Sequence, residues 1–448
     1  MKKPTPLNKE THFEFDELFF STTDARGIIQ YGNDVFVRIS GYPEETIIGA
    51  PHNIIRHPDM PKAVFKLFWD TLKDDKPIAA YVKNLSEDGQ YYWVFAFAFP
   101  VGQGYLSIRF KPSSPLFTKV QEIYSEVLSK EKKEALDESA SYLLKLIKNE
   151  GFETYEDFMV HAAIEELKYR EKNVHHDEES KSTQHQSGSS KITDITTETA
   201  HSLDESFAKI DSFLTGSQIY SQSIELLQNE FNQLKFLSIN MKVLAAKFGD
   251  KAATLGVISH EFSQLSGKIE ENLMGFSTFV TELASVIKLC SLNLAALKCQ
   301  MIMVDFFVKE SLSRLAFSQD AFSGMLKNRE SFTTLFESSV EKLSEGIKGL
   351  EDRLNHITIQ IKEIQKFISG LEVIKQTGAI ESARDDEIKK SFDYYLHEMD
   401  SFVALLRKTI SKLNEQREEL SKSTEVINRS TEKVSGKINE LFNLALNR

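Results

Sequence analysis

The chain has 448 residues, of which 41% are hydrophobic, and it carries a formal net charge of −12 at pH 7. This length suffices for two or three domains with substantial cores, and the acidic balance argues against a nucleic-acid-binding role. The two cysteines, Cys290 and Cys299, have neither a disulfide-framework spacing nor a zinc-ligand spacing. We therefore expect a protein of a reducing compartment.

Residues 1–13 read as a polar N-terminal tail without the apolar centre of a secretory signal. No later segment reaches the roughly 18 uncharged apolar residues that a membrane helix needs. The nearest, residues 286–308, contains Lys288, Lys298 and Asp305. These features predict a cytoplasmic protein with no membrane insertion.

Residues 14–115 have the pattern of a small α+β domain. The stretches 27–33 and 104–110 are rich in β-forming residues, and residues 79–101 read as a hairpin whose turn lies near Asp88 and Gly89. Shorter stretches of helical pattern lie between the early and late strands, at 33–41 and 60–72. We predict an antiparallel five-stranded sheet with helices on one side.

Residues 116–172 are expected to form a helical connector of two helices, broken near residues 149–151. Residues 173–191 have almost no apolar content and are expected to be a flexible linker. This linker contains His175, His176 and His185. A solvated linker explains these histidines better than a metal site, so we predict no bound metal.

Residues 192–448 contain no proline, and their apolar residues recur at steps of three and four. One such series is Leu354, Ile357, Ile361, Ile364, Ile368 and Leu371. Seams sustained over many heptads are typical of long helices packed as a coiled coil or a four-helix bundle. Breaks near residues 248–250, 318–320 and 377–378 divide the region into four helices of comparable length.

The stretch GAPHNIIRHPDMPKAVFKLFW, residues 49–69, concentrates two histidines, an arginine, an aspartate and three prolines. No nucleophile paired with a base, no GxGxxG motif and no P-loop accompanies it, so binding is favoured over catalysis. Arg56 is suited to clamping a phosphate, and an apolar slot can be built from Phe65, Phe68, Trp69 and Tyr92. The residues alone equally allow a structural cap in which Arg56 and Asp59 form a local ion pair.

Four segments together resemble the PAS domain of bacterial aerotaxis transducers: FSTTDARGIIQYGNDVFVRISGY, GAPHNIIRHPDMP, FWDTLKDDKPIAAYVKN and DGQYYWVFAFAFPV. The resemblance covers residues 14–113 and implies a non-enzymatic sensor that binds FAD non-covalently and reads redox state or oxygen. The positions that match the family's flavin pocket are Asn33, Arg56, His57, Asp59, Trp69 and Asn84. A haem-binding PAS domain is the alternative, with His57 or His52 as axial ligand.

The segment 235–269 resembles a divergent form of the hairpin tip with which such transducers, related to methyl-accepting chemotaxis proteins, bind a histidine kinase and its coupling protein. The candidate partner-binding residues are Asn240, Val243, Lys247 and Glu261. The segment departs from the family at Leu244, Lys247 and Asp250, where Glu, Arg and Glu are typical. Because Leu244 lacks the charge that is typical of the family, the alternative is an adaptor protein that binds another partner, such as another transducer.

Much less of the helical region precedes Gly249 than follows it, whereas a single hairpin has equal arms. We therefore expect the chain to fold back a second time, with a second tip in residues 369–387 beside Gly378. Two hairpins in one chain can form a four-helix bundle alone, and a homodimer is the other arrangement considered.

Overall fold

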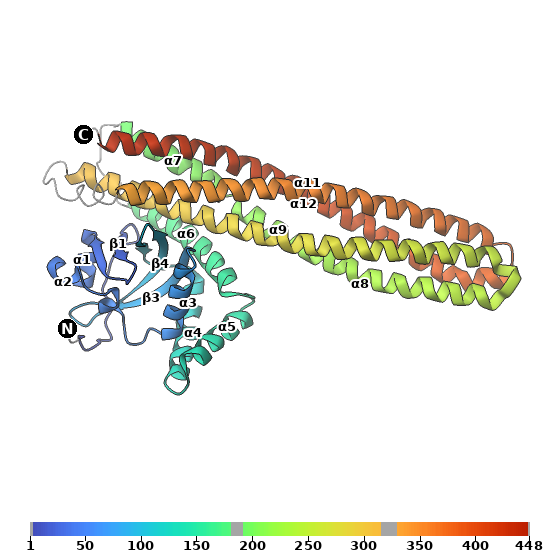
Figure 1. Cartoon of the computed structure of the whole chain (residues 1–448), viewed down its shortest axis with the longest axis horizontal. Helices are drawn as coiled ribbons and strands as arrows, with labels where there is room; N and C mark the ends of the chain where they lie inside the picture. The colour runs from blue at the N-terminus through green and yellow to red at the C-terminus, as the bar shows by residue number, and fades with distance from the viewer. Residues whose placement is uncertain (1–2, 181–190, 315–328, 447–448) are drawn as a thin grey trace. The chain divides into compact units, whose positions relative to one another are not determined.

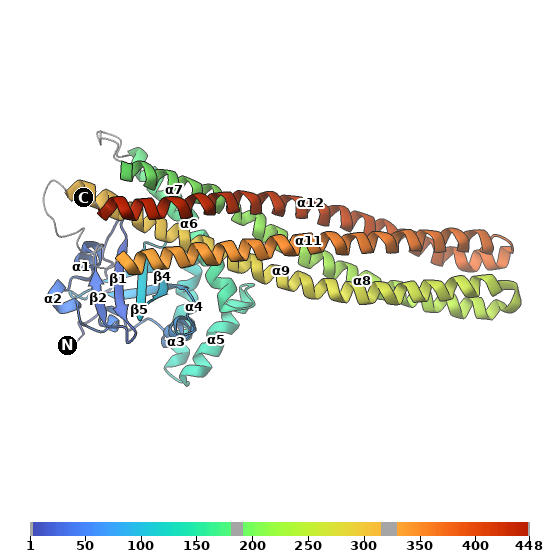
Figure 2. The same cartoon turned by 45° about the horizontal axis from the view of Figure 1, so that its top comes forward.

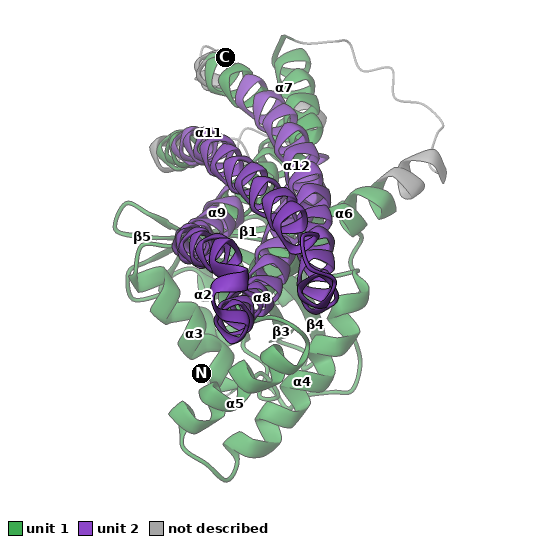
Figure 3. Cartoon of the chain, turned by 90° about the vertical axis from the view of Figure 1, so that its right-hand side faces the viewer, with its two compact units in different colours: residues 1–207, 291–343, 430–448 green, residues 208–290, 344–429 purple. Residues whose placement is uncertain are grey.

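The computed structural model describes residues 3–180, 191–314 and 329–446. The chain divides into two compact units, shown in green and purple in Figure 3. The first unit comprises residues 1–207, 291–343 and 430–448, and the second comprises residues 208–290 and 344–429.

The first unit contains a five-stranded antiparallel sheet in the order β2-β1-β5-β4-β3. Its strands are β1 (Phe19–Asp24), β2 (Ile29–Gly32), β3 (Ile78–Leu85), β4 (Tyr91–Val101) and β5 (Gly104–Phe110). In the turn between β3 and β4, Gly89 has a φ of 88° and the Asp88 carboxylate accepts the backbone N–H of Gln90. The predicted antiparallel five-stranded sheet is therefore confirmed.

Seven helices accompany this sheet along residues 34–180. They are α1 (Asp34–Ser40), α2 (Glu44–Ile47), the 3-10 helix η1 (His52–Ile55), α3 (Lys62–Lys73), α4 (Pro115–Glu131), α5 (Leu136–Asn149) and α6 (Tyr155–Ser180). The connector thus has three helices instead of the predicted two. Helix α6 also extends into the predicted linker as far as Ser180, and residues 181–190 lie outside the described residues.

Helices contact both faces of the sheet, whereas the sequence predicted helices on one side. Helix α3 packs on β3 and β4. On the other face, Phe117 of α4 packs against Tyr81 and Trp93, with ring centroids 5.7 and 5.3 Å apart. The physical reason is the alternation along β4, which places its large aromatic residues together on one face, where they have to be buried. That series is Trp93, Phe95, Phe97 and Phe99.

The second unit is an antiparallel four-helix bundle, and Figures 1 and 2 show its helices lying side by side. It contains α8 (Ile210–Phe248), η2 (Gly249–Ala252) and parts of α9 (Ala253–Arg314), α11 (Arg329–Ser382) and α12 (Asp386–Leu446). The Tyr220 hydroxyl donates a hydrogen bond to the Leu413 carbonyl across the bundle, at 3.0 Å. Helix α7 (Lys191–Phe207) belongs to the first unit.

The second turn of this bundle lies at residues 383–385, where the Asp385 carboxylate caps α12 by accepting the backbone N–H groups of Glu387 and Ile388. This turn lies within residues 369–387, where the second tip was predicted. The predicted break at Gly378 itself is wrong, because α11 continues to Ser382. A side-chain carbon at position 378 would lie 3.2 Å from Leu396, so this glycine permits close helix packing. The break predicted near residues 318–320 lies outside the described residues.

Within the described residues, one helical run, Lys191–Val308, contains a window long and apolar enough to cross a membrane. In that window 61% of the residues are buried inside the protein. A helix that is surrounded by other parts of a protein core is also apolar on every side. The window is therefore weak evidence of a membrane span.

Candidate functional site

A cavity of about 530 Å³ lies between one face of the sheet and α3. The alternation of β4 creates it, because Ala96 and Ala98 project small side chains on the face that α3 covers. Val82 of β3 adds to the same floor. The volume falls in the range of about 300–1,000 Å³ that small-molecule sites occupy.

Aromatic side chains of α3 form one wall of the cavity. Phe65, Phe68 and Trp69 all line it, and the Trp69 ring meets Tyr105 of β5 edge to face, with centroids 5.4 Å apart. Gly27, with a φ of 75°, lets the loop before β2 pass beside Trp69, since an added side-chain carbon there would lie 3.1 Å from the indole ring. The cavity therefore has an apolar, aromatic side.

Arg109 of β5 lines the polar side of the cavity and is only 5% exposed. Its Nη2 donates a hydrogen bond to Ser21 Oγ at 3.0 Å and lies 2.6 Å from His52 Nε2. Its Nη1 has no hydrogen-bond partner within the described part of the chain. A buried donor without a partner is costly, and a bound ligand with an acceptor atom would satisfy it.

Burial determines the protonation states of Arg109 and His52 at this polar side of the cavity. It lowers the pKa of Arg109 to about 10, so the guanidinium remains positive at neutral pH. Burial, together with the nearby Arg109 charge, holds the pKa of His52 well below its usual range. His52 is therefore neutral, and with its proton on Nδ1 its Nε2 accepts from Arg109. This side of the cavity therefore presents the Arg109 charge and an N–H group that has no partner among the described residues.

Basic side chains gather along the outer part of the cavity lining. Lys62, Lys66 and Lys73 of α3 line it together with Arg56, and the acidic residue Asp70 lies 3.0 Å from Lys66 in an ion pair. The Arg56 guanidinium stacks 4.4 Å above the Phe65 ring and donates to the Met60 carbonyl at 2.8 Å. This excess of positive charge favours an anionic group such as a phosphate.

Three of the six predicted cofactor-binding residues line the cavity: Arg56, Trp69 and Asn84. Asn84 is 2% exposed and belongs to β3, and its backbone forms an isolated bridge with that of Arg56. The sheet thus brings residues from α3, β3 and the segment before α3 to one place.

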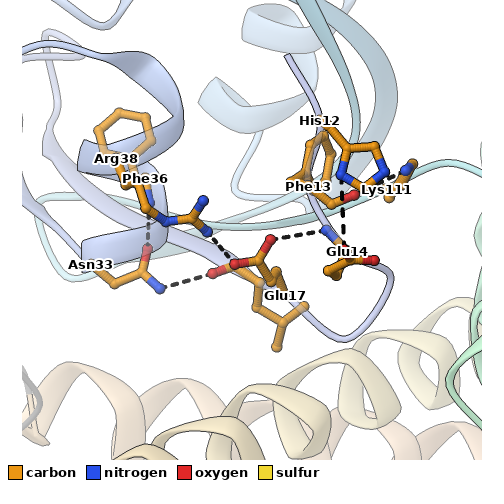
Figure 4. A network of polar contacts seen from close by, with 9 residues as sticks. His12, Phe13, Glu14, Glu17, Asn33, Phe36, Arg38 and Lys111 are labelled. Atoms are coloured by element: carbon orange, nitrogen blue, oxygen red, sulfur yellow. Dashed lines mark hydrogen bonds and ion pairs between the residues drawn. The ribbon is translucent and has the colours of Figure 1, made fainter. Parts of the chain in front are cut away.

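Asn33 is not among the cavity-lining residues, because its side chain caps α1. Its Oδ1 accepts the backbone N–H groups of Phe20 and Phe36 at 2.9 and 3.2 Å, and its Nδ2 donates to the Leu18 carbonyl at 2.8 Å. Figure 4 shows this cap beside the ion pair between Glu17 and Arg38. Asn33 therefore joins β1 to α1.

His57 and Asp59 also lie outside the cavity lining. The His57 side chain is 3% exposed, and its Nδ1 accepts the Asp59 backbone N–H at 3.1 Å. Burial first, and then the charge of Lys83, lower the pKa of His57 to about 4. Asp59 is exposed and lies 3.1 Å from Lys83 Nζ. These two residues fix the turn that follows Arg56.

The polar residues that β1 and β5 contribute to the cavity were not predicted from the sequence. Ser107, Arg109 and Tyr105 are alternate residues of β5, and Ser21 and Thr23 are alternate residues of β1, paired with β5 in register. Polar residues at a period of two within an otherwise apolar strand are the signal that could have identified them.

The four predicted partner-binding residues lie on the first hairpin of the second unit. Asn240, Val243 and Lys247 are exposed on α8, and Glu261 is exposed on α9. Phe236 on α8 is 68% exposed and Val243 is 66% exposed. These two lie two helical turns apart, so this face of α8 carries an exposed apolar stripe.

Residues 29–106 match the family model described as the PAS fold. The N-terminal domain is therefore a PAS domain, and a long helical region follows it. Over 126 residues, 27% of this chain, the sequence is 40% identical to the aerotaxis receptor of Escherichia coli strain K12. The match spans a quarter of that receptor's length, 25%.

Solved structures similar to the chain include the light state of the blue-light photoreceptor Aureochrome1 LOV, at 22% identity and a TM-score of 0.20. That likeness covers 26% of this chain and 91% of the LOV chain. A variant of the fungal photoreceptor VVD matches at 16% identity and a TM-score of 0.19, over 25% of this chain and 86% of its own.

Proposed function

We propose that the PAS domain binds FAD in the cavity beside Arg109, and that the protein senses redox state or oxygen and relays it to a chemotaxis signalling complex. The observation that carries the proposal is the lining of the cavity. An aromatic wall, a buried guanidinium with an unused N–H group and a basic outer rim are the three surroundings that a flavin dinucleotide needs. The 40% identity to an aerotaxis receptor supports it.

Each part of the lining has a role in this proposal. Phe65, Phe68 and Trp69 would enclose the ring system, and Arg56 with the lysines of α3 would hold the diphosphate. Arg109 would meet an acceptor at the ring edge. A bound flavin supplies a reversible electron acceptor. Because Arg109 stays charged, it would stabilise any negative charge gained there.

The surroundings of both candidate axial ligands favour flavin over haem. His57 is outside the cavity lining, and its Nδ1 is already an acceptor for Asp59. His52 faces the cavity with its Nε2 beside the Arg109 guanidinium, a cation that a metal ion would have to displace. Neither histidine is therefore positioned as a haem ligand.

We infer that the face of α8 with Asn240 and Val243 binds the chemotaxis coupling protein or kinase in the cytoplasm, without catalysis by this chain. The exposed apolar stripe from Phe236 to Val243 supports a docking role, because exposed apolar patches mark interaction sites. The alternative is a partner outside chemotaxis, because Leu244 stands where a glutamate is typical of the family.

An absorption spectrum of the purified full-length protein tests the proposed cofactor. We expect flavin bands that dithionite bleaches, and FAD identified by mass after denaturation. A colourless preparation that takes up no FAD from solution, or a haem spectrum, would contradict the proposal.

A further inference from the structure

Helix α6 is fixed to the PAS domain by buried polar contacts. The Glu166 carboxylate is fully buried and accepts hydrogen bonds from the Tyr81 hydroxyl at 2.8 Å and the Ser114 hydroxyl at 2.6 Å. One turn further, Arg170 donates to the backbone carbonyls of Phe15 and Asp16, just before β1. Any displacement of α6 from the sheet would leave Glu166 and Arg170 without these partners.

The next residue, Glu171, connects α6 to α9 through Lys298. Lys298 Nζ lies 3.1 Å from the Glu171 carboxylate and 2.6 Å from the Asp204 carboxylate of α7. It also lies 4.7 Å from the centroid of the Phe207 ring. Helices α6 and α7 and the part of α9 that belongs to the first unit therefore meet at one ammonium group.

Lys298 is the one charged residue between Leu289 and Val304, a stretch of α9 that is otherwise apolar or neutral. Its side chain is 6% exposed, whereas those of Glu171 and Asp204 are 38% and 46% exposed. An ammonium in such surroundings is tolerated only while its carboxylates remain in place.

We propose that Lys298, Glu171 and Asp204 form an electrostatic clasp that couples the packing of α9 to the position of the sensor-attached helix α6. Withdrawal of Glu171 would leave Lys298 with Asp204 alone among apolar groups, and α9 would then open locally. The clasp concerns the helices, whatever ligand the PAS cavity holds; its use as a signal route rests on the proposed function.

The two native cysteines report this opening. Cys299 is adjacent to Lys298, and burial raises the pKa of its thiol to about 12. Cys290 lies on the same helix and is also buried, with its pKa raised to about 12. Both thiols are therefore slow to react with an alkylating reagent until the helix opens. Cys290 serves as the internal reference.

Alkylation of full-length protein with iodoacetamide, followed by peptide mass spectrometry, tests the clasp. In the double variant Glu171→Gln with Asp204→Asn, the unpaired charge should raise Cys299 labelling at least about tenfold. Cys290 labelling should stay within about twofold of the wild type. Adding Lys298→Met should restore slow Cys299 labelling, because the unpaired charge is gone.

Unchanged Cys299 labelling in the double variant would overturn the proposal, and so would a failure of Lys298→Met to restore protection. An equal rise at Cys290 would also overturn it, because it would mean that the whole helix opens. The single variant Lys298→Met covers the case in which the double variant does not fold. It should keep Cys299 protected, and rapid labelling in it would show that Lys298 acts by packing and not by charge.

Discussion

Arg109 is a buried cation whose hydrogen-bonding capacity is only partly used within the described part of the chain. Its Nη1 has no hydrogen-bond partner among the residues that the structure describes, whereas Nη2 donates to Ser21 and faces His52. Removing the guanidinium should therefore affect the protein in opposite ways with and without ligand. Asn33 differs, since all the contacts of its amide are within the fold.

We predict that Arg109→Met weakens FAD binding by about 10- to 100-fold, the loss expected for a hydrogen bond to a charged group. The melting temperature of the ligand-free protein should stay the same or rise, because a buried cation with an unused N–H is removed. Fluorescence titration of FAD and thermal unfolding measure the two effects. Arg26→Met is the control, since that arginine is exposed and pairs with Asp24 outside the cavity. Equal FAD affinity in Arg109→Met would contradict the assigned role.

For Asn33→Ala we predict a loss of about 1–3 kcal/mol of unfolding free energy, because a helix cap and two further buried hydrogen bonds are removed. The FAD affinity of the folded fraction should not change. Urea unfolding followed by FAD titration separates the two quantities. Asn149→Ala, at the exposed end of α5, is the matched control and should be near neutral. A variant that folds as stably as the wild type but no longer binds FAD would instead place Asn33 in the cofactor site.

At the scale of elements, the sequence predicted what depends on local periodicity. The alternation of β4 and the helical seams of the bundle follow from single segments, so both were found. The turn at 383–385 lies within the predicted second tip, residues 369–387, but it was placed at Gly378 because a glycine signals either a helix end or a close approach of two helices. At Gly378 the glycine serves a close approach of two helices, and this follows only from the position of Leu396, which the sequence does not show. The place of Arg109 in the cavity lining likewise depends on the pairing of β5 with β1, two strands that are far apart in the sequence.

Two glycines of the bundle differ in how closely they are packed, so a larger side chain should change the unfolding free energy differently at each. A side-chain carbon at Gly216 would lie 2.8 Å from Leu420, whereas at Gly267 nothing lies within 4 Å. Gly216→Val should therefore destabilise the bundle by about 1–3 kcal/mol through overpacking. Gly267→Val should be neutral or slightly stabilising, because valine has a better helix propensity than glycine. Thermal unfolding followed by circular dichroism compares them, and an equal loss in both variants would show that packing around Gly216 is not the cause.

At the scale of the whole molecule, the similarity to known proteins lies in the sensor domain, and the output region is described by its fold. The PAS match ends at residue 106, and the aerotaxis-receptor match covers 27% of the chain. The four-helix bundle follows from its seams and is common to many functions. Two hairpins in one chain place two tips in the second unit, and each is a candidate for partner binding.

Two exposed valines, one on each hairpin, distinguish these tips. Val243 on the first is 66% exposed and Val373 on the second is 62% exposed, so an aspartate at either position should leave the unfolding free energy within about 0.5 kcal/mol of the wild type. If the apolar stripe of α8 is the docking face, Val243→Asp should abolish pull-down of the chemotaxis coupling protein, because burying the new carboxylate is costly. Val373→Asp should bind like the wild type. Equal loss in both variants would place the interface across both hairpins, and a wild-type protein that does not bind the coupling protein would favour the adaptor with another partner.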